Sequence, residues 1–329
     1  MVERINSITL LNTTYQNRYD ILDVDLLFTP WQNNDMSQAF INCINLTSVN
    51  NINENVTNMC YTFHNCQGLN ETPVIPSNVV VMYGTFSDCS SLINAPVIPN
   101  NVQSISHAFI NCSSLTDAPE LPDNITDLSF TFLGCSSLTN APVIPNSVTN
   151  MYSTFSNCSN LTDAPEIPSN VNIMTFCFSG CEKIINTITI PNSVTNMYGT
   201  FIDCTNLSIA PEIPDSVEYM HSTFYNCTNL SGDVIIYSKN ITSATNCFYG
   251  TSLDKNVYIP FQNNGVNTTT FDAFVNAGYS TETRNHGVLL IDLNCDPLAD
   301  YEYEIDESND VLLTRYIGNE LHVVVPTVE

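Results

Sequence analysis

The sequence predicts a solenoid of parallel, strand-like coils, mostly β, in which one 23-residue repeat forms each coil. Three columns carry this prediction: a Phe-x-x-Cys pair, a leucine or isoleucine three residues after each cysteine, and a proline. The first two keep the 23-residue step without an insertion over about nine repeats. Such columns are typical of units that bury their apolar side only by stacking on their neighbours. The pairs are Phe40/Cys43, Phe63/Cys66, Phe86/Cys89, Phe109/Cys112, Phe132/Cys135, Phe155/Cys158, Phe178/Cys181, Phe201/Cys204 and Phe224/Cys227.

Segments within one repeat predict extended chain rather than helix. Residues 138–145 (Leu-Thr-Asn-Ala-Pro-Val-Ile-Pro) and 148–151 (Val-Thr-Asn-Met) illustrate them. They are too short for helices, and the first is too rich in proline. We therefore expect strand-like pieces joined by turns, with equivalent residues one above another in successive coils. The phenylalanine, cysteine and leucine columns then face the interior.

The chain divides into three regions. Residues 36–260 hold the leucine-rich repeat array. Terminal coils of a solenoid expose apolar faces and open strand edges, so both ends need caps. Residues 1–35, which contain Trp31, predict an N-terminal cap. Residues 261–329 predict a small α+β or β cap at the C-terminal end, or an attachment module.

The C-terminal region loses the repeat pattern and predicts other elements. Residues 271–278 predict a short helix that ends at Gly278, and residues 286–293 predict a strand. Two further strands are expected at 310–318 and 323–329.

The charge of the chain limits its partners. Of 329 residues, 33 are acidic and seven are Lys or Arg, which gives a net charge of −26. This charge opposes binding to nucleic acid and to anionic membranes, and it favours solubility, cationic partners or metal ions. No segment is long and apolar enough to span a bilayer, so we expect no membrane insertion.

Thirteen cysteines raise the question of disulfides or a metal site, but nine of them form the repeat column. Identical register places each thiol about 5 Å from the next, with parallel side chains. No Cys-x-x-Cys pair suggests zinc, and the total is odd. We therefore expect a buried, reduced column, which agrees with synthesis in the cytosol. The cysteines outside the column are Cys60, Cys177, Cys247 and Cys295.

The string from Ser147 to Thr162, Ser-Val-Thr-Asn-Met-Tyr-Ser-Thr-Phe-Ser-Asn-Cys-Ser-Asn-Leu-Thr, resembles the BspA-like leucine-rich repeats. That family's repeat has the form Ile-Pro-x-Ser-Val-Thr-x-Ile/Met, then an aromatic residue, two residues, a cysteine and a leucine. The match recurs over about two thirds of the chain. Members occur in bacterial and protozoan surface proteins, and similar repeats occur in phage-encoded proteins. The resemblance implies adhesion or partner binding and carries over no catalytic residue.

Catalysis is not expected from these residues. The histidines keep no column that pairs them with a fixed carboxylate or thiol. A catalytic thiolate must be exposed and activated, whereas the column cysteines are expected in the core. No phosphate-binding glycine loop, His-Glu-x-x-His or Gly-x-Ser-x-Gly motif is present. We therefore predict neither an enzyme nor a cofactor. The histidines are His64, His107, His221, His286 and His322.

Carboxylates recur on alternate coils. Glu120, Glu166 and Glu212 share one column and fall on every second coil, about 10 Å apart, and Asp117 and Asp163 share this alternation. A calcium ion needs about six to eight oxygens around it, which this arrangement does not gather. We interpret the alternation as avoidance of direct like-charge stacking.

Variable positions beside the inward Met column are the candidate binding residues. If the methionine points inward, the next residue of a strand-like segment points outward, which places Tyr83, Tyr152 and Tyr198 on one outer strip. Exposed aromatic residues are common contacts for proteins and sugars. The alternative, that they only cover coil junctions, stays open. The candidate contact residues are Tyr83, Tyr152, Tyr198, Phe130, Phe176 and His221.

These observations predict a non-catalytic interaction or structural protein that presents a rigid, acidic repeat surface to a protein or a host-surface glycan. The N-terminal residues lack the basic start and apolar stretch of a secretory signal. We therefore expect a phage virion component, such as a tail, fibre or decoration protein, made in the host cytoplasm and assembled into a larger particle. The alternatives are a fragment of a bacterial cell-surface adhesin and, third, an enzyme.

Overall fold

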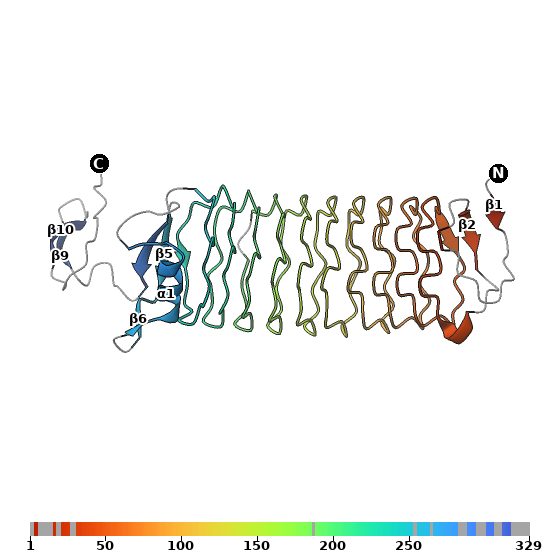
Figure 1. Ribbon diagram of the computed structural model, residues 1–329, viewed down its shortest axis with the longest axis horizontal. Coiled ribbons are helices and arrows are strands. Elements are labelled where there is room, and N and C mark those ends of the chain that lie inside the picture. The colour runs from red at the N-terminus through yellow and green to blue at the C-terminus, as the bar shows by residue number, and fades with distance from the viewer. Residues whose placement is uncertain are drawn as a thin grey trace.

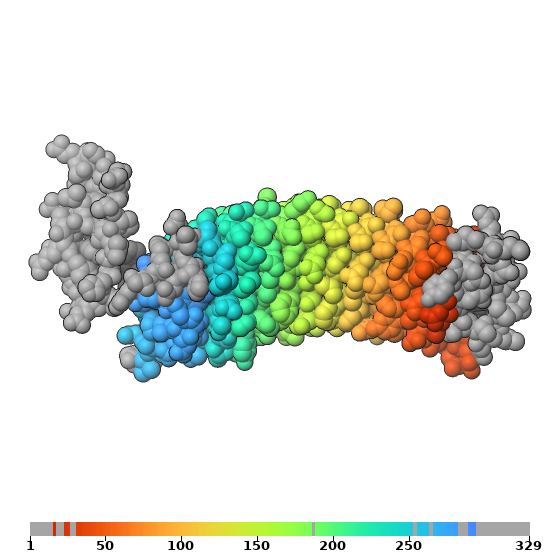
Figure 2. Space-filling view, turned by 45° about the horizontal axis from the view of Figure 1, so that its top comes forward, coloured from red at the N-terminus to blue at the C-terminus, as the bar shows by residue number. Residues whose placement is uncertain are grey.

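A computed structural model describes residues 3–5, 16–17, 21–26, 31–185, 188–252, 255–263, 266–281, 288–293, 301–305 and 311–316. The described coils stack into one long rod, along which the chain advances coil by coil (Figure 1). The space-filling view shows the coils as successive bands along this rod (Figure 2). The predicted solenoid is confirmed, with the same residue columns buried in each coil.

Backbone hydrogen bonds from the Met-to-Asn segment of each repeat join neighbouring coils. Every second N–H of this segment donates to a carbonyl of the next coil, with one exception at Ile105. Met151 N–H donates to Ile173 O at 3.0 Å, and Phe155 N–H donates to Cys177 O at 2.9 Å. The intervening groups close tight turns within the coil, as Thr154 N–H does with Met151 O at 3.3 Å. This segment is therefore a run of turns rather than a strand.

The predicted strand-like segments pair through single residues rather than through continuous ladders. Parallel bridges join Asn140 to Asp163 and Asn150 to Ile173, for example. Prolines in the first of these segments limit the pairing, because proline has no N–H to donate to a ladder. Among the described residues, strands of two or more residues occur only before residue 51 and after residue 233. The coils are thus less regular in their β structure than the sequence suggested.

A parallel sheet begins the described array. Its strands are β1 (Glu3–Ile5), β2 (Ile21–Asp25) and β3 (Ser48–Asn50), hydrogen-bonded in that order. A short 3-10 helix, η1 (Gln32–Asn34), lies between β2 and β3 along the chain.

A second parallel sheet follows the last regular coil, with β4 (Val234–Ile235), β5 (Lys255–Ile259) and β8 (Val288–Asp292) in that order. Lys255, the first residue of β5, is fully buried. Its Nζ donates to Leu230 O at 2.7 Å and to Ser252 O at 2.8 Å, so backbone carbonyls surround the amine.

Helix α1 (Thr269–Asn276) lies against the last coil. Its Phe274 ring stacks on Phe248 with centroids 6.2 Å apart, which extends the phenylalanine column by one ring. Tyr279, just beyond the helix, accepts a hydrogen bond from Phe248 N–H at 2.9 Å through its hydroxyl. The predicted helix is confirmed and starts two residues earlier than expected, at 269 rather than 271. Gly278, at its end, has a φ of +90°, a conformation that glycine adopts readily.

Two antiparallel pairs complete the described elements: β6 (Gln262–Asn263) with β7 (Val266–Asn267), and β9 (Tyr301–Ile305) with β10 (Val311–Tyr316). The strand predicted at 310–318 is present as β10. The one predicted at 323–329 lies outside the described residues, and β10 pairs with β9 instead. The division of the chain at residues 35 and 260 stays a prediction.

The core is a set of continuous columns. Phenylalanine rings from Phe40 to Phe248 stack in nine steps, with centroids 5.5–5.8 Å apart. The Met, Phe, Cys and Leu columns have essentially no exposed area. The predicted inward columns are therefore confirmed.

Polar groups inside the core also join adjacent coils. Thr154 Oγ1 donates to Leu128 O at 3.0 Å, and Cys158 Sγ donates to Phe132 O at 3.1 Å. The same two contacts recur in most coils, so the buried hydroxyls and thiols have partners. The column cysteines are buried and free, as predicted, whereas Cys295 lies outside the described residues.

The residue before each column cysteine adopts left-handed backbone. It is always Asn, Asp or Gly, the types that tolerate this conformation best, with φ of +60° at Asn157 and +74° at Gly180. The side chains of this column bond from coil to coil, as Asn65 Nδ2 does to Asn42 Oδ1 at 2.8 Å. The tight turn before each cysteine therefore has a sequence requirement of its own.

Replacing Phe155 by Ala is expected to lower the free energy of unfolding by about 3 to 5 kcal/mol, because the central ring of a buried stack would leave a cavity. Val143→Ala is the matched control: this side chain is 89% exposed, and the change should cost under about 0.5 kcal/mol. Urea unfolding measures both. A loss below about 1 kcal/mol for Phe155→Ala would contradict the stacked core.

The fold should lose stability at alkaline pH. Burial raises the pKa of the Cys89, Cys135, Cys158 and Cys181 thiols well above the ordinary 9.0, and that of Cys247 to about 12. Because the folded-state pKa values are raised, their contribution is fully present below pH 9 and is lost as the pH rises above it. Each thiol should add a slope of about 1.4 kcal/mol per pH unit.

Urea unfolding between pH 8 and 10 measures this slope. The Cys158→Ala variant lacks one buried thiol, so its slope should be smaller by the contribution of that thiol. Thiol labelling of the native protein should be slow at the column and faster at Cys60, which is partly exposed. Rapid labelling of many thiols without denaturant, or a pH-independent stability, would contradict the buried column.

Candidate recognition surface

Eight aromatic side chains form one continuous strip along the outside of the rod, which we call the aromatic ladder. Each of eight successive coils contributes one ring. Neighbouring centroids lie 4.7–6.2 Å apart, so every ring contacts the next. Its members are Tyr61, Tyr83, His107, Phe130, Tyr152, Phe176, Tyr198 and His221.

The rings come from two adjacent positions, the first and the second residue after the buried Met column. The second position always has left-handed backbone, with φ of +53° at Tyr61 and +58° at Phe130. Side chains therefore do not alternate between faces there as they do along a strand. Where one position holds a ring, the other holds a small residue: Cys, Gly, Ser or Thr. Either position can thus supply the ring.

Two glycines make room for the ladder. A Cβ on Gly84 would lie 2.4 Å from Cε1 of Tyr61, and one on Gly199 would lie 2.4 Å from Cε1 of Phe176. Both glycines have positive φ, +59° and +61°. At these coils the ring from the coil before occupies the space that a side chain would fill.

The structure brings all six predicted contact residues into this ladder and adds Tyr61 and His107, which were not predicted from the sequence. The methionine column is buried, as expected, but the assumption of strand-like alternation was wrong, because the segment consists of turns. The tyrosines are less exposed than expected: Tyr198 is 37% exposed, whereas Tyr83 and Tyr152 are partly buried. Phe130, Phe176 and His221 are partly buried as well. Whether the ladder binds a partner stays a prediction.

Burial shifts the pKa of two rings in the N-terminal part of the ladder. Burial, followed by a hydrogen bond with Tyr83, raises the pKa of Tyr61 to about 12. Burial lowers the pKa of His107, with nearby Asp127 opposing the shift, so the imidazole between Tyr83 and Phe130 is neutral at pH 7. These rings therefore present an uncharged, weakly polar surface.

A second outer surface is formed by the proline-containing segments, in which the column of alternating carboxylates lies. Glu120, Glu166 and Glu212 are exposed there, as are the equivalent valines. Two shallow grooves of about 550 and 610 Å³ lie on this surface. Across the described residues, no group of three or more His, Cys, Asp or Glu side chains is placed to hold a metal ion.

Little among the described residues suits catalysis. The column thiols lie in the core with raised pKa values, which opposes their use as nucleophiles. His64 Nδ1 lies 3.4 Å from Asp88 Oδ2, and its ring packs edge-on against Tyr61, which places this pair beside the ladder. His286 and His322 lie outside the described residues. None of the helices in the described ranges is long and apolar enough to cross a membrane.

The repeats match one known family. A model described as the BspA type leucine rich repeat region fits this chain in six copies, over residues 36–162, 83–208 and 152–277. The chain belongs to this family. Repeats of this family are generally non-catalytic, and leucine-rich repeat domains typically bind proteins. No curated protein matches the chain.

Solved structures of bacterial leucine-rich repeat proteins are similar to the chain. One from Bacteroides ovatus shares 21% identity over 78% of each chain, with a TM-score of 0.46. One from Eubacterium ventriosum shares 18% over 75% of this chain and 73% of its own, with a TM-score of 0.47. A leucine rich cell surface protein from Faecalibacterium prausnitzii shares 18% over 88% and 87%, with a TM-score of 0.36.

Gly84→Ala should disturb the ladder. The added methyl group would displace the Tyr61 ring and strain a left-handed residue, at a cost of about 1 to 2 kcal/mol. Spectroscopic titration should show the pKa of Tyr61 falling from about 12 toward 10. Gly232→Ala is the control, because the nearest atom to its added Cβ is 3.8 Å away and its φ is not left-handed. Equal behaviour of the two variants would contradict the contact between Tyr61 and Gly84.

Proposed function

We propose that this chain is a non-catalytic binding scaffold that uses the aromatic ladder to hold a protein partner. The observation that supports this most is the ladder itself, eight touching rings that lie partly exposed on a rod whose core columns are already complete. Packing fixes these rings in place. A partner therefore gains large apolar contacts without the entropic cost of ordering flexible side chains.

A host-surface glycan is the second candidate partner. Tyrosine, phenylalanine and histidine rings offer apolar faces and a few polar atoms, which suits sugars as well as proteins. The contacts between neighbouring rings favour a protein, because each ring already turns part of its surface toward its neighbour.

The setting that we propose is a phage particle, in which the rod serves as a tail, fibre or decoration protein. Free cysteines throughout the core suit assembly in a reducing cytosol. Mass spectrometry of purified particles from the host of origin tests this setting. Presence in the bacterial envelope and absence from particles would assign the chain to the alternative, a cell-surface adhesin.

Changing Tyr83, Tyr152 and Tyr198 together to Ser should weaken recognition at least tenfold while the rod stays folded, because these rings would no longer fill the contact surface. The readout is attachment to host cells or incorporation into particles, measured beside circular dichroism of each variant. A variant of three tyrosines outside the ladder, Tyr219, Tyr225 and Tyr249, each to Ser, is the matched control. Loss of recognition in both variants, or in neither, would count against the ladder as the contact surface.

A further inference from the structure

The proline segments form a continuous outer surface, which we call the proline face. Each segment has the form Pro-x-Ile-Pro, with Leu121 in place of Ile in one coil, and the residue x points outward. The segments are Pro73–Pro76, Pro96–Pro99, Pro119–Pro122, Pro142–Pro145, Pro165–Pro168 and Pro211–Pro214.

Large apolar side chains on the proline face are unusually exposed. Val74, Val97 and Val143 occupy position x and are 83%, 88% and 89% exposed, the highest values for large apolar side chains among the described residues. The isoleucines that follow them are buried beneath, so the core is complete without the valines. Valines in full contact with water contribute nothing to folding by burial, whereas they contribute to binding when a partner covers them.

Part of the backbone of the proline face is also free to bond. On the opposite strip of the coil, every second N–H reaches the next coil. Within the described residues, the N–H groups of Val143 and Ile144 have no protein partner, and the same holds for Val97 and Ile98. The second groove, of about 610 Å³, lies beside Val143 and Ile144. In the first groove, of about 550 Å³, Ile213 N–H donates to Ile235 O at 2.9 Å and Tyr237 N–H donates to Ile213 O at 2.8 Å, so two of its three coils are joined.

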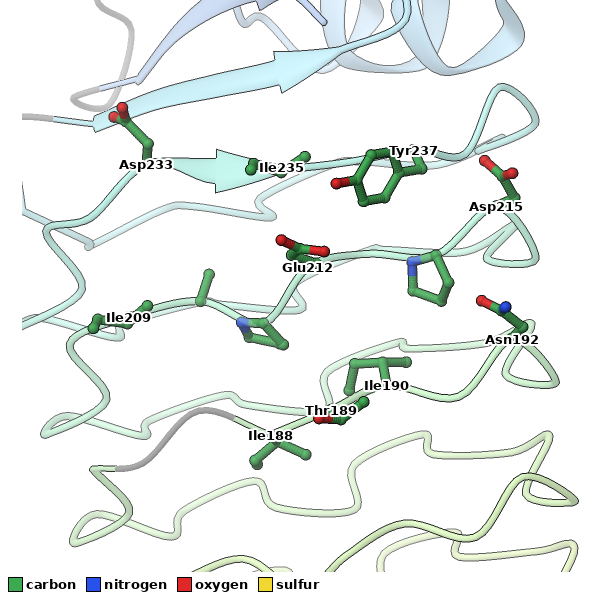
Figure 3. Close-up of a pocket in the computed structure, with 13 residues that line it drawn as sticks. Ile188, Thr189, Ile190, Asn192, Ile209, Glu212, Asp215, Asp233, Ile235 and Tyr237 are labelled. Carbon is green, nitrogen blue, oxygen red and sulfur yellow. The ribbon is translucent and has the colours of Figure 1, made fainter.

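Carboxylates and an aromatic ring line the first groove, whose labelled side chains come from three successive coils (Figure 3). Glu212, Asp215 and Asp233 lie around it with Tyr237 and Ile209. The side chains of Tyr237 and Ile209 are exposed. None of the described residues that line it is Lys, Arg or His. Among the described residues, the side chains of Glu212 and Asp215 have no hydrogen-bond or ion-pair partner.

The second groove has the same chemistry. Asp123, Asp163 and Glu166 lie around Val143, again without a basic residue. From residue 31 to residue 252 the chain has only two basic residues, Lys183 and Lys239, against sixteen Asp and Glu. The charges of the proline face are therefore left for a partner to neutralise.

We propose that the proline face binds a basic, extended polypeptide segment of a partner protein. Lysine and arginine combine an aliphatic stem with a cationic end, so their stems cover the exposed valines and prolines while their ends reach the carboxylates. The unpaired N–H groups bond carbonyls of the same segment. This surface is separate from the aromatic ladder, because no ladder residue lines either groove.

Spacing sets a further property of the partner. Glu120, Glu166 and Glu212 fall on alternate coils, about 10 Å apart. A polyproline II segment places every third side chain on one side, about 9.3 Å apart. A segment with a basic residue at every third position therefore matches the carboxylate column along several coils.

The test is the binding of four probes to the full chain by isothermal titration calorimetry. The first is the capped peptide (Arg-Pro-Val)₄, and the second has the same composition with its arginines contiguous. The third is (Glu-Pro-Val)₄, and the fourth is spermine, a polycation without apolar side chains. The first peptide should bind saturably and more tightly than the other three, and its affinity should fall between 50 and 500 mM NaCl.

Variants locate the binding. The double variant Glu166→Gln with Glu212→Gln should bind the first peptide about tenfold more weakly, since each exposed ion pair contributes about two- to fivefold to the affinity. Glu182→Gln with Glu218→Gln changes the net charge equally away from the grooves and should change affinity less than twofold. The double variant Val97→Ser with Val143→Ser should also bind the first peptide more weakly, because valines that the peptide covers contribute apolar contact.

Several results would overturn the proposal. These are no binding of the first peptide, equal binding of spermine, or equal losses in the two pairs of Glu→Gln variants, which would mean that the acidity of the whole rod attracts any polycation. The variant with three ladder tyrosines changed to Ser should bind the peptide as the parent does. Failure of the proline face and failure of the ladder are therefore separate results.

Discussion

Register between coils depends on the hydrogen bonds that every second N–H of the Met-to-Asn segment donates to the coil ahead. These bonds require the segment to turn tightly, and the turns require left-handed residues at two fixed places, one beside the aromatic ladder and one before each cysteine. Once the backbones are joined in this way, each side chain lies above its equivalent. The Phe stack, the thiols and the ladder all follow from that alignment, because none of them can shift by one residue alone.

The sequence was sufficient to predict the buried columns, and it was insufficient to predict the tight turns between them. Phe155, Cys158 and Leu161 recur at a fixed step, and only burial by stacking explains such a step, so their place in the core was predictable. The short helix near Gly278 was predictable from its composition and its terminal glycine. Strand-like alternation, by contrast, was the wrong local geometry beside the Met column. Alternation would place the positions of Tyr83 and Phe130 on opposite faces, whereas the structure joins these two rings through His107.

Two signals in the sequence pointed to the turns and were missed. The residue before each column cysteine is always Asn, Asp or Gly, which indicates a left-handed backbone there. The positions of Tyr83 and Gly84 also hold one ring and one small residue in eight coils, a reciprocal pattern that indicates one shared space. The two grooves of the proline face were not predictable, because proline content alone does not give the width of the gap between adjacent coils.

The single-step repeat also bears on how the length of the rod changes. The string Ala-Pro-Val-Ile-Pro-Asn occurs unaltered at residues 95–100 and 141–146, so two coils two steps apart present the same proline segment. Insertion or deletion of one 23-residue unit would add or remove one whole coil. Such a change would keep the hydrogen-bonding register, since the step is 23 residues from Phe40 to Phe224, and it would lengthen or shorten the ladder and the proline face together. Related chains would then form a length series with one cross-section, in which reach and the number of contacts change in whole units while the fold stays the same.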